Sequence, residues 1–268
     1  MQTNNYSYNA ERDSAILFSH PLVIASLGTL SLGPTLHGIF ENGYCYDYLK
    51  GIPLVPEDLK DPHIKTLIAK YLRNWHKSTI LVPDKFSCFE NDKRFKEMTS
   101  KEWIKKEEFL DQTNAPVVFA HNDLLPANIL YDKEEDHVWF IDYEYASYNY
   151  RGFDIGNHFC EFAGTRSPLQ WEAYPSKAEQ MEFLRAYLGE PNTCQFSHVG
   201  GETDAEHELE RLYVEANQFS LAAHLFWGTW AFVQSETSDI DYDYMGYGLA
   251  RLGEYLNRKH EFLSLQLT

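Results

Sequence analysis

Residues 117–164 read VVFAHNDLLPANILYDKEEDHVWFIDYEYASYNYRGFDIGNHFCEFAG, and the rest of the chain is organised around them. Residues 117–120 are four apolar residues that follow a proline, a pattern that predicts a strand. Residues 128–131 and 138–143 predict two further strands, and the charged run DKEEDH between them predicts a hairpin with a solvated turn. The stretch therefore predicts three short strands with polar residues at their ends.

Those polar residues are three carboxylates and an amide, namely Asp123, Asn128, Asp142 and Glu144. Phosphoryl transfer from a nucleotide requires a carboxylate to receive a hydroxyl proton and oxygen ligands for Mg²⁺. The protein-kinase pattern is H-x-D, an Asn five residues after that Asp, and a later Asp. The sequence follows this order with His121, Asp123, Asn128 and Asp142. The alternative is that these are ordinary surface residues, but surface acids need not lie at the ends of strands. The spacing therefore predicts a phosphotransferase that uses ATP and Mg²⁺.

The same residues resemble the choline/ethanolamine kinase family. The resemblance rests on HNDLLPANIL at 121–130 and on IDYEYASYNYRGFDIGNHFCEF at 141–162. Residues 217–234 and 244–256 also resemble the family's C-terminal helices. FAG at 162–164, together with these helices, is more similar to the ethanolamine branch than to the choline branch.

The resemblance begins at about Glu11 and implies an α/β (α+β), protein-kinase-like two-lobed fold, similar to aminoglycoside phosphotransferases. It implies a truncated N-terminal lobe and hinge in residues 1–50 and a mainly helical catalytic lobe in residues 51–268. The family's first strands, which cover the phosphates and carry a cation for them, precede the matched region. Ala15 stands where the family has the acid that pairs with that cation. A catalytically silent, lobe-deleted relative that acts by binding a partner therefore remains an alternative.

The resemblance and the motif together assign roles to the polar residues. Asp123 is the expected catalytic base, and Asn128 and Asp142 are the expected Mg²⁺ ligands. Glu144 lies two residues beyond Asp142 and points the same way on an extended strand end. We therefore expect a catalytic role for Glu144, either at a second metal or behind the first. His121 is an alternative base, although Asp123 fits the template better.

Two charged residues of RGFDIGNHF, Arg151 and Asp154, are expected to be structural. Asp154 would anchor the catalytic loop or the N-terminus of a helix. Arg151 would pair with Asp154 or with a phosphate, and the structural pairing is preferred. His121 and Asn122 are expected to shape the loop.

The nucleotide is expected to meet the chain at Tyr46, Asp47 and Tyr48. In the resembled fold this run, with Leu49, is the hinge whose backbone contacts the adenine of ATP. From the sequence alone, without the resemblance, Tyr46 and Tyr48 are better explained as ordinary half-buried aromatic residues of a strand.

The implied substrate is an amino alcohol, whose ammonium group requires negative charge and aromatic faces. Glu161 is the expected carboxylate, and Trp227 and Trp230 share one side of a helix because they are three residues apart. Tyr247 completes the expected site, which matches the family's amino-alcohol site. Without the resemblance, Trp227 and Trp230 would be interpreted as residues of the hydrophobic core. The implied reaction is ATP-dependent phosphorylation of ethanolamine to phosphoethanolamine, the first step of phosphatidylethanolamine synthesis, with choline as the alternative substrate.

Composition narrows the remaining classes. The 268 residues carry a net charge of −17, from 23 basic and 40 acidic residues. This charge excludes a protein that binds nucleic acid through a broadly basic surface. The negative electrostatic field of such a protein either attracts a cationic substrate or simply keeps the protein soluble.

The four cysteines form no C-x-x-C pair, which disfavours a zinc knuckle. Four thiols in a chain of this size indicate a reducing compartment. No long apolar run or signal-like N-terminus is present, so we expect a cytoplasmic protein without a transmembrane segment. A homodimer is a possible assembly that the sequence does not decide.

Outside the central stretch, residues 11–29 predict a helix kinked or interrupted at Pro21. Residues 35–49 predict a hairpin with a turn at Asn42-Gly43. Periodic apolar residues predict further helices, which we place at residues 61–76, 102–110, 176–187, 206–234 and 244–257.

Overall fold

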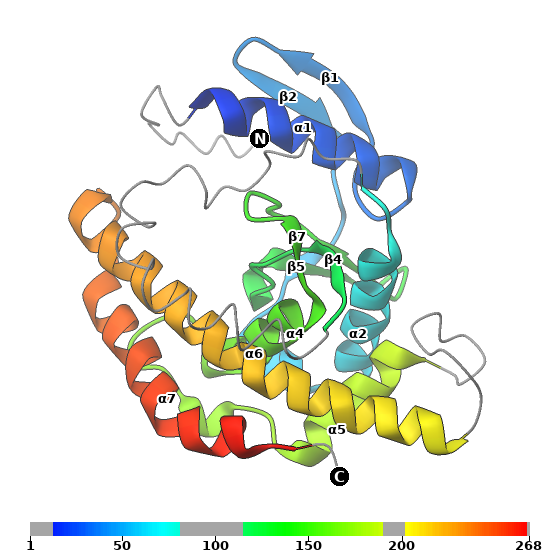
Figure 1. Cartoon of the computed structure of the whole chain (residues 1–268). Helices are drawn as coiled ribbons and strands as arrows, with labels where there is room; N and C mark the ends of the chain where they lie inside the picture. Colours follow the sequence, from blue (N-terminus) through cyan, green and yellow to red (C-terminus); the bar gives the residue numbers. More distant parts are fainter. Residues whose placement is uncertain (1–12, 81–114, 190–201, 267–268) are drawn as a thin grey trace.

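The computed structural model describes residues 13–80, 115–189 and 202–266. The N-terminal part consists of helix α1 (Asp13–Thr29) and the antiparallel hairpin β1 (Leu36–Phe40) and β2 (Gly43–Tyr46), which lie together at one end of the molecule (Figure 1). The expected hairpin is confirmed. The expected helix is confirmed from Asp13 onward. Of the two alternatives at Pro21, a kink or an interruption, the interruption is wrong, because α1 continues through Pro21. A proline removes one backbone donor, and burial of apolar side chains later in α1 offsets that loss.

Helix α2 (Pro62–Lys77) follows a short strand β3 (Ile52–Pro53) and a 3₁₀ turn η1 (Pro56–Lys60). Asp61 caps α2 by accepting the backbone N–H groups of His63 and Ile64, and Pro62 occupies the first helical position. The helix is amphipathic and buries its apolar side, including Trp75, against the strands. The helix expected at residues 61–76 is therefore confirmed.

The strands of the central stretch form two small antiparallel sheets. Strand β5 (Ile129–Asp132) pairs with β6 (His137–Phe140), as the hairpin pattern predicted, and β3 joins the other side of β5. The expected strand β4 (Val117–Ala120) pairs with β7 (Ser147–Tyr150), a strand that was not predicted. Ala120 is opposite Ser147 in this pair. The segments that follow β4 and precede β7 therefore leave the sheet at the same end.

The C-terminal part is helical. It comprises α4 (Arg151–Cys160), the 3₁₀ turns η3 (Glu161–Ala163) and η4 (Trp171–Ala173), α5 (Lys177–Leu188), α6 (Glu202–Thr237) and α7 (Tyr244–Ser264). Helix α4 is buried along its whole length and packs on α6, while α7 lies along the outer side of α6 (Figure 1). The helices expected near the C-terminus are confirmed, and α7 extends beyond its expected end. The helix expected at 102–110 lies outside the described residues.

Helices α4 and α6 approach closely because α4 presents glycine to α6. A Cβ atom at Gly156 would lie 2.4 Å from the carbonyl oxygen of Ala216 and 2.6 Å from the backbone nitrogen of Ser220. Any side chain at this position would push the two helices apart. Among the helices described, none is long and apolar enough to cross a bilayer.

Candidate active site

The loop after β4 carries the H-N-D motif in a tightly held conformation. Asn122 has a φ of 66°, a left-handed conformation that Asn tolerates better than most residues. Its side-chain amide donates to the carbonyl oxygen of Tyr145 and to the hydroxyl of Ser147, at 2.8 and 2.9 Å. His121 is buried, and its ring bonds the Ile141 carbonyl oxygen at 2.9 Å and the Asp123 backbone N–H at 3.4 Å. These contacts use both ring nitrogens to shape the loop, which favours Asp123 over His121 as the base.

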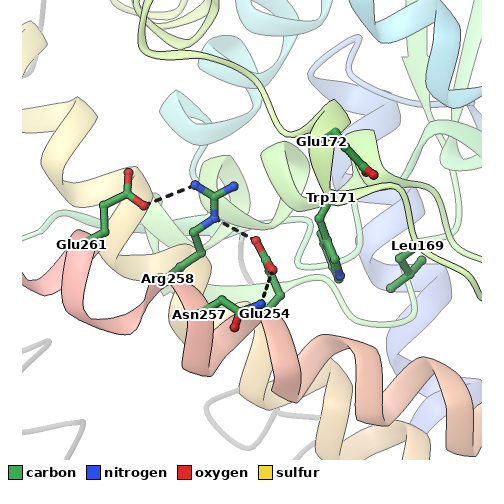
Figure 2. A pocket seen from close by; sticks show the side chains of 7 residues that line it. All are labelled: Leu169, Trp171, Glu172, Glu254, Asn257, Arg258 and Glu261. Atoms are coloured by element: carbon green, nitrogen blue, oxygen red, sulfur yellow. Dashed lines mark hydrogen bonds and ion pairs between the residues drawn. The ribbon is translucent and has the colours of Figure 1, made fainter.

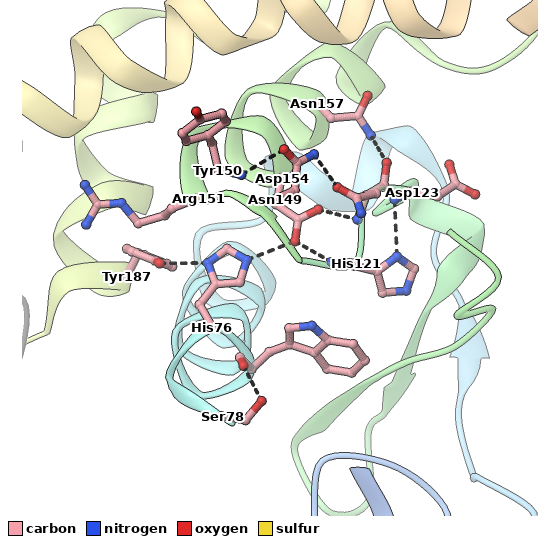
Figure 3. Close-up of polar contacts among 12 residues, drawn as sticks. His76, Ser78, His121, Asp123, Asn149, Tyr150, Arg151, Asp154, Asn157 and Tyr187 are labelled. Atoms are coloured by element: carbon pink, nitrogen blue, oxygen red, sulfur yellow. Dashed lines mark hydrogen bonds and ion pairs between the residues drawn. The ribbon is translucent and has the colours of Figure 1, made fainter. Parts of the chain in front are cut away.

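Asp154 anchors this loop from α4 (Figure 3). Its two carboxylate oxygens accept the backbone N–H groups of His121 and Asn122, each at 2.6 Å. Nε2 of His76 in α2 lies 2.9 Å from the same carboxylate, and the Tyr187 hydroxyl lies 2.8 Å from Nδ1 of His76. Burial disfavours the charged form of Asp154, yet the hydrogen bond and charge of His76 hold its pKa below the usual value. The expected anchoring role of Asp154 is confirmed.

Arg151 is structural as well, but its partners differ from the expected one. Its buried guanidinium lies 2.7 Å from Glu215 and 3.3 Å from Glu208, both on α6. These ion pairs are made with two acids of α6 and not with Asp154, because the Arg151 side chain packs against α6.

Asp123 and Asn128 lie together at the end of the loop. The Asn128 amide nitrogen donates to the Asp123 carbonyl oxygen at 2.9 Å and to the Asp123 carboxylate at 3.0 Å. The short 3₁₀ turn η2 (Pro126–Asn128) makes this contact possible by bending the chain back toward Asp123. Because the amide nitrogen faces Asp123, the amide oxygen of Asn128 remains available as an acceptor or metal ligand.

The acids after β6 lie within electrostatic range of this pair. Burial raises the pKa of Asp123 well above its usual value, and the charges of Glu161, Asp142 and Glu144 raise it further. Burial also raises the pKa of Glu144 to about 7, with Asp142 contributing. Asp142 itself is exposed and has a φ of 64°. The fold thus brings together acids that are separated by up to 38 positions in the sequence, from Asp123 to Glu161.

The donor set fits a divalent cation. Mg²⁺ in nucleotide sites is usually held by one or two protein oxygens together with phosphate oxygens and water. The exposed Asp142 carboxylate and the side-chain oxygen of Asn128 are oxygen atoms of this kind, and nearby Glu144 provides further negative charge. A cation would offset the mutual repulsion of these acids. The described residues contain no group of three or more His, Cys, Asp or Glu side chains placed as metal ligands.

Glu161 occupies a different environment from the one expected of an open ammonium-binding carboxylate. It is 3% exposed, and its Oε1 lies 2.9 Å from Nη1 of Arg251 on α7. Burial raises its pKa, and the Arg251 guanidinium opposes that rise. Arg251 also lies 3.4 Å from the side-chain oxygen of Asn157. Glu161 therefore lies near Asp123 as expected, but part of its charge is already compensated within the protein.

The expected aromatic residues meet in one buried cluster of α6, α7 and the loop after β6. Trp227 packs against the rings of Tyr145 and Trp230, with centroids 5.2 and 5.3 Å apart. The Trp230 indole N–H donates to the Tyr145 hydroxyl at 3.1 Å. Tyr247 packs against Tyr242, and the Arg251 guanidinium carbon lies 5.7 Å from its ring centroid. Trp227 and Tyr247 are only 5% and 6% exposed, so they also contribute to the core.

The expected nucleotide residues lie at the β1–β2 hairpin, beside β6 and the segment that carries Asp142 and Glu144. Asp47 and Tyr48 line a depression of about 410 Å³ together with the turn after α1 and Trp139. Tyr48 is 86% exposed. The Asp47 side chain contacts His37 and the Thr35 backbone N–H, and the hydrogen bond from His37 lowers its pKa. Tyr46 lies on β2, partly exposed and outside the residues that line this depression.

A second depression, of about 530 Å³, lies between η4 and α7 (Figure 2). Three glutamates, Asn257, Arg258 and two apolar residues line it, and none of the expected site residues is among them. Arg258 is paired with Glu254 at 2.8 Å and with Glu261 at 3.2 Å. Arg258 is therefore already paired with two of the three glutamates that line this depression.

Sequence reasoning missed His76, Tyr145 and Arg251. His76 and Arg251 are single residues far in sequence from the motif that they contact, so no spacing rule singles them out. Tyr145 lies inside the motif stretch and reads there as an ordinary aromatic residue. Only the packing of α2 and α7 against the central stretch reveals the other two.

The comparisons with known proteins agree with this geometry. The family model for choline/ethanolamine kinases matches residues 8–106 and 86–256 of the chain. The chain belongs to the choline/ethanolamine kinase family. The probable ethanolamine kinase of Nematostella vectensis is 41% identical over 266 residues, which cover 89% of this chain and 74% of that protein. The ethanolamine kinase of Drosophila melanogaster is 39% identical over 268 residues, covering 89% of this chain and 50% of its own length.

A solved structure of a family member also resembles this chain. The ethanolamine kinase of Plasmodium vivax superposes with a TM-score of 0.72 at 26% identity, covering 94% of this chain and 74% of that one. The kinase-like fold expected from the resemblance is thereby confirmed. The chain spans between 50% and 74% of the lengths of these three family members.

Proposed function

We propose that this chain phosphorylates ethanolamine with ATP to give phosphoethanolamine, the first step of phosphatidylethanolamine synthesis. The observation that carries the proposal is the placement of Asp123, whose carboxylate accepts the Asn128 amide N–H at 3.0 Å in a loop held by Asp154. Glu161, Asp142 and Glu144 lie close enough for their charges to raise the pKa of Asp123. The expected base, metal-binding acids and ammonium-binding acid thus act on one another at one site. A site with this excess of negative charge suits two cations, Mg²⁺ and a substrate ammonium.

In this proposal Asp123 accepts the ethanolamine hydroxyl proton as the oxygen bonds to the γ-phosphorus of ATP and the bond to ADP breaks. The Asn128 amide N–H holds the Asp123 carboxylate, and Asp154 holds the loop behind it. Asn128 and Asp142 would hold Mg²⁺, with Glu144 nearby. When bound, the cation neutralises phosphate charge and orients the transferred group. The depression at Asp47 and Tyr48 is the proposed place for the nucleotide, with Tyr46 nearby on β2.

Ethanolamine is proposed ahead of choline for a chemical reason. Its ammonium has N–H donors, which a carboxylate such as Glu161 can accept, whereas the methylated cation of choline has none. The aromatic rings of Trp227, Trp230 and Tyr247 can attract both cations. The relatives named as ethanolamine kinases support the same preference.

The test is ADP release by the full chain with Mg-ATP and either ethanolamine or choline. We expect a higher kcat/KM with ethanolamine. Asp123→Asn should lower kcat by about 10²-fold or more with little change in the KM for ATP, since a positioned base contributes about 10²–10⁴-fold. Glu134→Gln, an exposed acid in the β5–β6 turn, is the matched control and should retain activity.

Other outcomes are equally informative. Near-normal turnover by Asp123→Asn would assign the base role elsewhere. A higher kcat/KM with choline would reverse the substrate preference and leave the kinase reaction in place. A folded chain that releases no ADP with either substrate would favour the catalytically silent alternative.

A further inference from the structure

Arg251 of α7 lies behind the acid that is expected to bind the substrate ammonium. Its side chain is fully buried. Its Nη1 lies 2.9 Å from Oε1 of Glu161, and its Nη2 donates to the side-chain oxygen of Asn157 at 3.4 Å. Its guanidinium carbon lies 5.7 Å from the ring centroid of Tyr247. The guanidinium therefore contacts the expected ammonium-binding residues from inside the protein.

These contacts connect Glu161 to the candidate catalytic loop. The amide nitrogen of Asn157 donates to the carbonyl oxygen of Asn122 at 3.4 Å (Figure 3), while its oxygen accepts from Arg251. Asn122 directly precedes Asp123. A guanidinium presents its donors in a fixed fork, and an amide both donates and accepts. Hydrogen bonds therefore run from the substrate acid through Arg251 and Asn157 to the backbone beside the expected base.

Only one oxygen of Glu161 is used in these contacts. In the part of the chain that the structure describes, the ion pair and hydrogen bond of its side chain go to Oε1, and Oε2 has no partner. The carboxylate lies near the expected base, because its charge contributes to the raised pKa of Asp123. Both oxygens of a carboxylate accept hydrogen bonds. Oε2 is therefore the atom that remains to accept an ammonium N–H.

We propose that Arg251 is a positioning residue for the reaction, which holds Glu161 by one oxygen so that the other faces the ammonium group of the substrate. This inference rests on the function proposed above, and Arg251 itself does not touch the substrate. Its charge has a second effect. Burial raises the pKa of Glu161 and the guanidinium opposes that rise, so Arg251 favours the ionised form that attracts a cation.

No other group near Glu161 replaces this effect. The other titratable groups that interact with Glu161 are Asp123 of the catalytic loop, Cys160 of α4, Tyr242 before α7 and Tyr247 of α7. The first is an acid and repels Glu161. Burial raises the pKa of the thiol and of both phenols, which leaves them neutral near pH 7. Among the residues described, Arg251 is the only base paired with Glu161.

The experiment compares KM and kcat for ethanolamine in the unmodified full chain and in Arg251→Gln, at pH 6.5 and pH 8.5. We expect the KM of the variant to exceed that of the unmodified chain by about tenfold or more at pH 6.5. The ratio should fall toward one at pH 8.5, because Glu161 without the guanidinium is protonated at low pH and ionises as the pH rises. The kcat should change less than KM.

Two further variants identify the cause. Arg251→Lys retains the charge and should recover most of the affinity lost at pH 6.5. Arg258→Gln is the matched control, because Arg258 lies on the same helix and is also paired with glutamates. It should leave the KM for ethanolamine nearly unchanged at both pH values.

A second measurement requires no substrate. Arg251→Gln leaves a buried carboxylate without its cation, which raises the pKa of Glu161 further, so the protonated form stabilises the chain at low pH and is lost as the pH rises. The substitution should therefore lower the melting temperature more at pH 8.5 than at pH 6.5. Adding Glu161→Gln should remove that difference. This measurement tests Arg251 even if the unmodified chain releases no ADP, so the two proposals can fail separately.

Three results would overturn the inference. A KM ratio for Arg251→Gln that is equal at both pH values would make Arg251 a purely structural link between α7 and η3. A lower KM in Arg251→Gln would make the guanidinium a competitor of the substrate. An equal rise in KM in Arg258→Gln would indicate a general effect of disturbing α7.

Circular dichroism checks that Arg251→Gln folds. If that variant loses helix, the infrared difference between the unmodified chain and Glu161→Gln at pH 6.5 decides. We expect the band of an ionised carboxylate, and the band of a protonated carboxyl group would contradict the role of Arg251.

Discussion

Nη1 of Arg251 lies 2.9 Å from Oε1 of Glu161, and both side chains are buried. This pair joins the last helix of the chain to the 3₁₀ turn beside the candidate catalytic loop. An acid expected to bind substrate is thus also a structural partner, and a substitution there has two separable effects.

Glu161→Gln should lower kcat/KM for ethanolamine by about 10-fold or more and should lower it less for choline. The reason is that hydrogen bonds to charged groups contribute about 1.5–3 kcal/mol, and only ethanolamine donates one. The same variant should reduce stability, because it leaves the buried Arg251 without its anion. Steady-state kinetics with both substrates and a melting curve measure the two effects.

The control for that variant is the double substitution Glu161→Gln with Arg251→Gln. It should recover part of the lost melting temperature without recovering selectivity for ethanolamine. Equal losses for both substrates in the single variant would mean that Glu161 contributes charge and not a hydrogen bond.

The stabilising effect of Mg²⁺ should increase with pH. The pKa of Glu144 is raised to about 7 in the folded chain, so its protonated form adds stability that is present at low pH and is lost as the pH rises through about 7. A cation bound by the acids replaces that proton at pH 8. We expect MgCl₂ to raise the melting temperature more at pH 8 than at pH 5.5.

Glu144→Gln should reduce this pH dependence, because it removes the titrating group, and Glu134→Gln should not. An Mg²⁺ effect that is equal at both pH values in the unmodified chain would contradict the coupling. Removing the metal with EDTA at pH 8 should return the melting temperature to its metal-free value.

His76→Ala should lower kcat several-fold with little change in either KM. The substitution removes the side chain that holds the Asp154 carboxylate at 2.9 Å, and Asp154 in turn holds the backbone of His121 and Asn122. It should also lower stability by about 1–3 kcal/mol, the cost of an unsatisfied buried polar group. Tyr187→Phe, which removes only the outer hydrogen bond, should have a smaller effect.

A purely structural role for His76 would predict a different result. Stability would fall in both variants while kcat per folded molecule stayed unchanged. His76→Gln, which retains a donor, should recover part of the kcat lost in His76→Ala.

Gly156→Ala should destabilise the chain by about 1–3 kcal/mol, because its Cβ would lie 2.4 Å from a backbone oxygen of α6 and the two helices would have to separate. Gly253→Ala is the matched helical control. Nothing lies within 4 Å of its Cβ, so it should stabilise by about 0.5–1 kcal/mol through helix propensity. Chemical denaturation at low protein concentration measures both, and equal effects would contradict the close approach of α4 and α6.

Much of the local structure follows from the sequence because it depends on short-range patterns. The β5–β6 hairpin, the α2 helix with its Asp61 cap, and the helices near the C-terminus all follow from periodicity and turn residues. Strand β7 was missed although Ser and Asn alternate with Tyr in SYNY, because a four-residue run without a β-branched residue is a weak strand signal and its pairing with β4 is non-local. Pro21 does not interrupt α1, because the packing of the apolar side chains later in the helix outweighs one lost hydrogen bond.

The sequence by itself determined the spacing of Asp123, Asn128, Asp142 and Glu144, and therefore the kind of chemistry that the chain can carry. Only the tertiary structure decided that Glu161 pairs with Arg251 and that His76 holds Asp154. The physical reason is distance along the chain. These pairs are 90 and 78 residues apart, and their contacts exist only because the packing of α2, α4 and α7 buries both partners together.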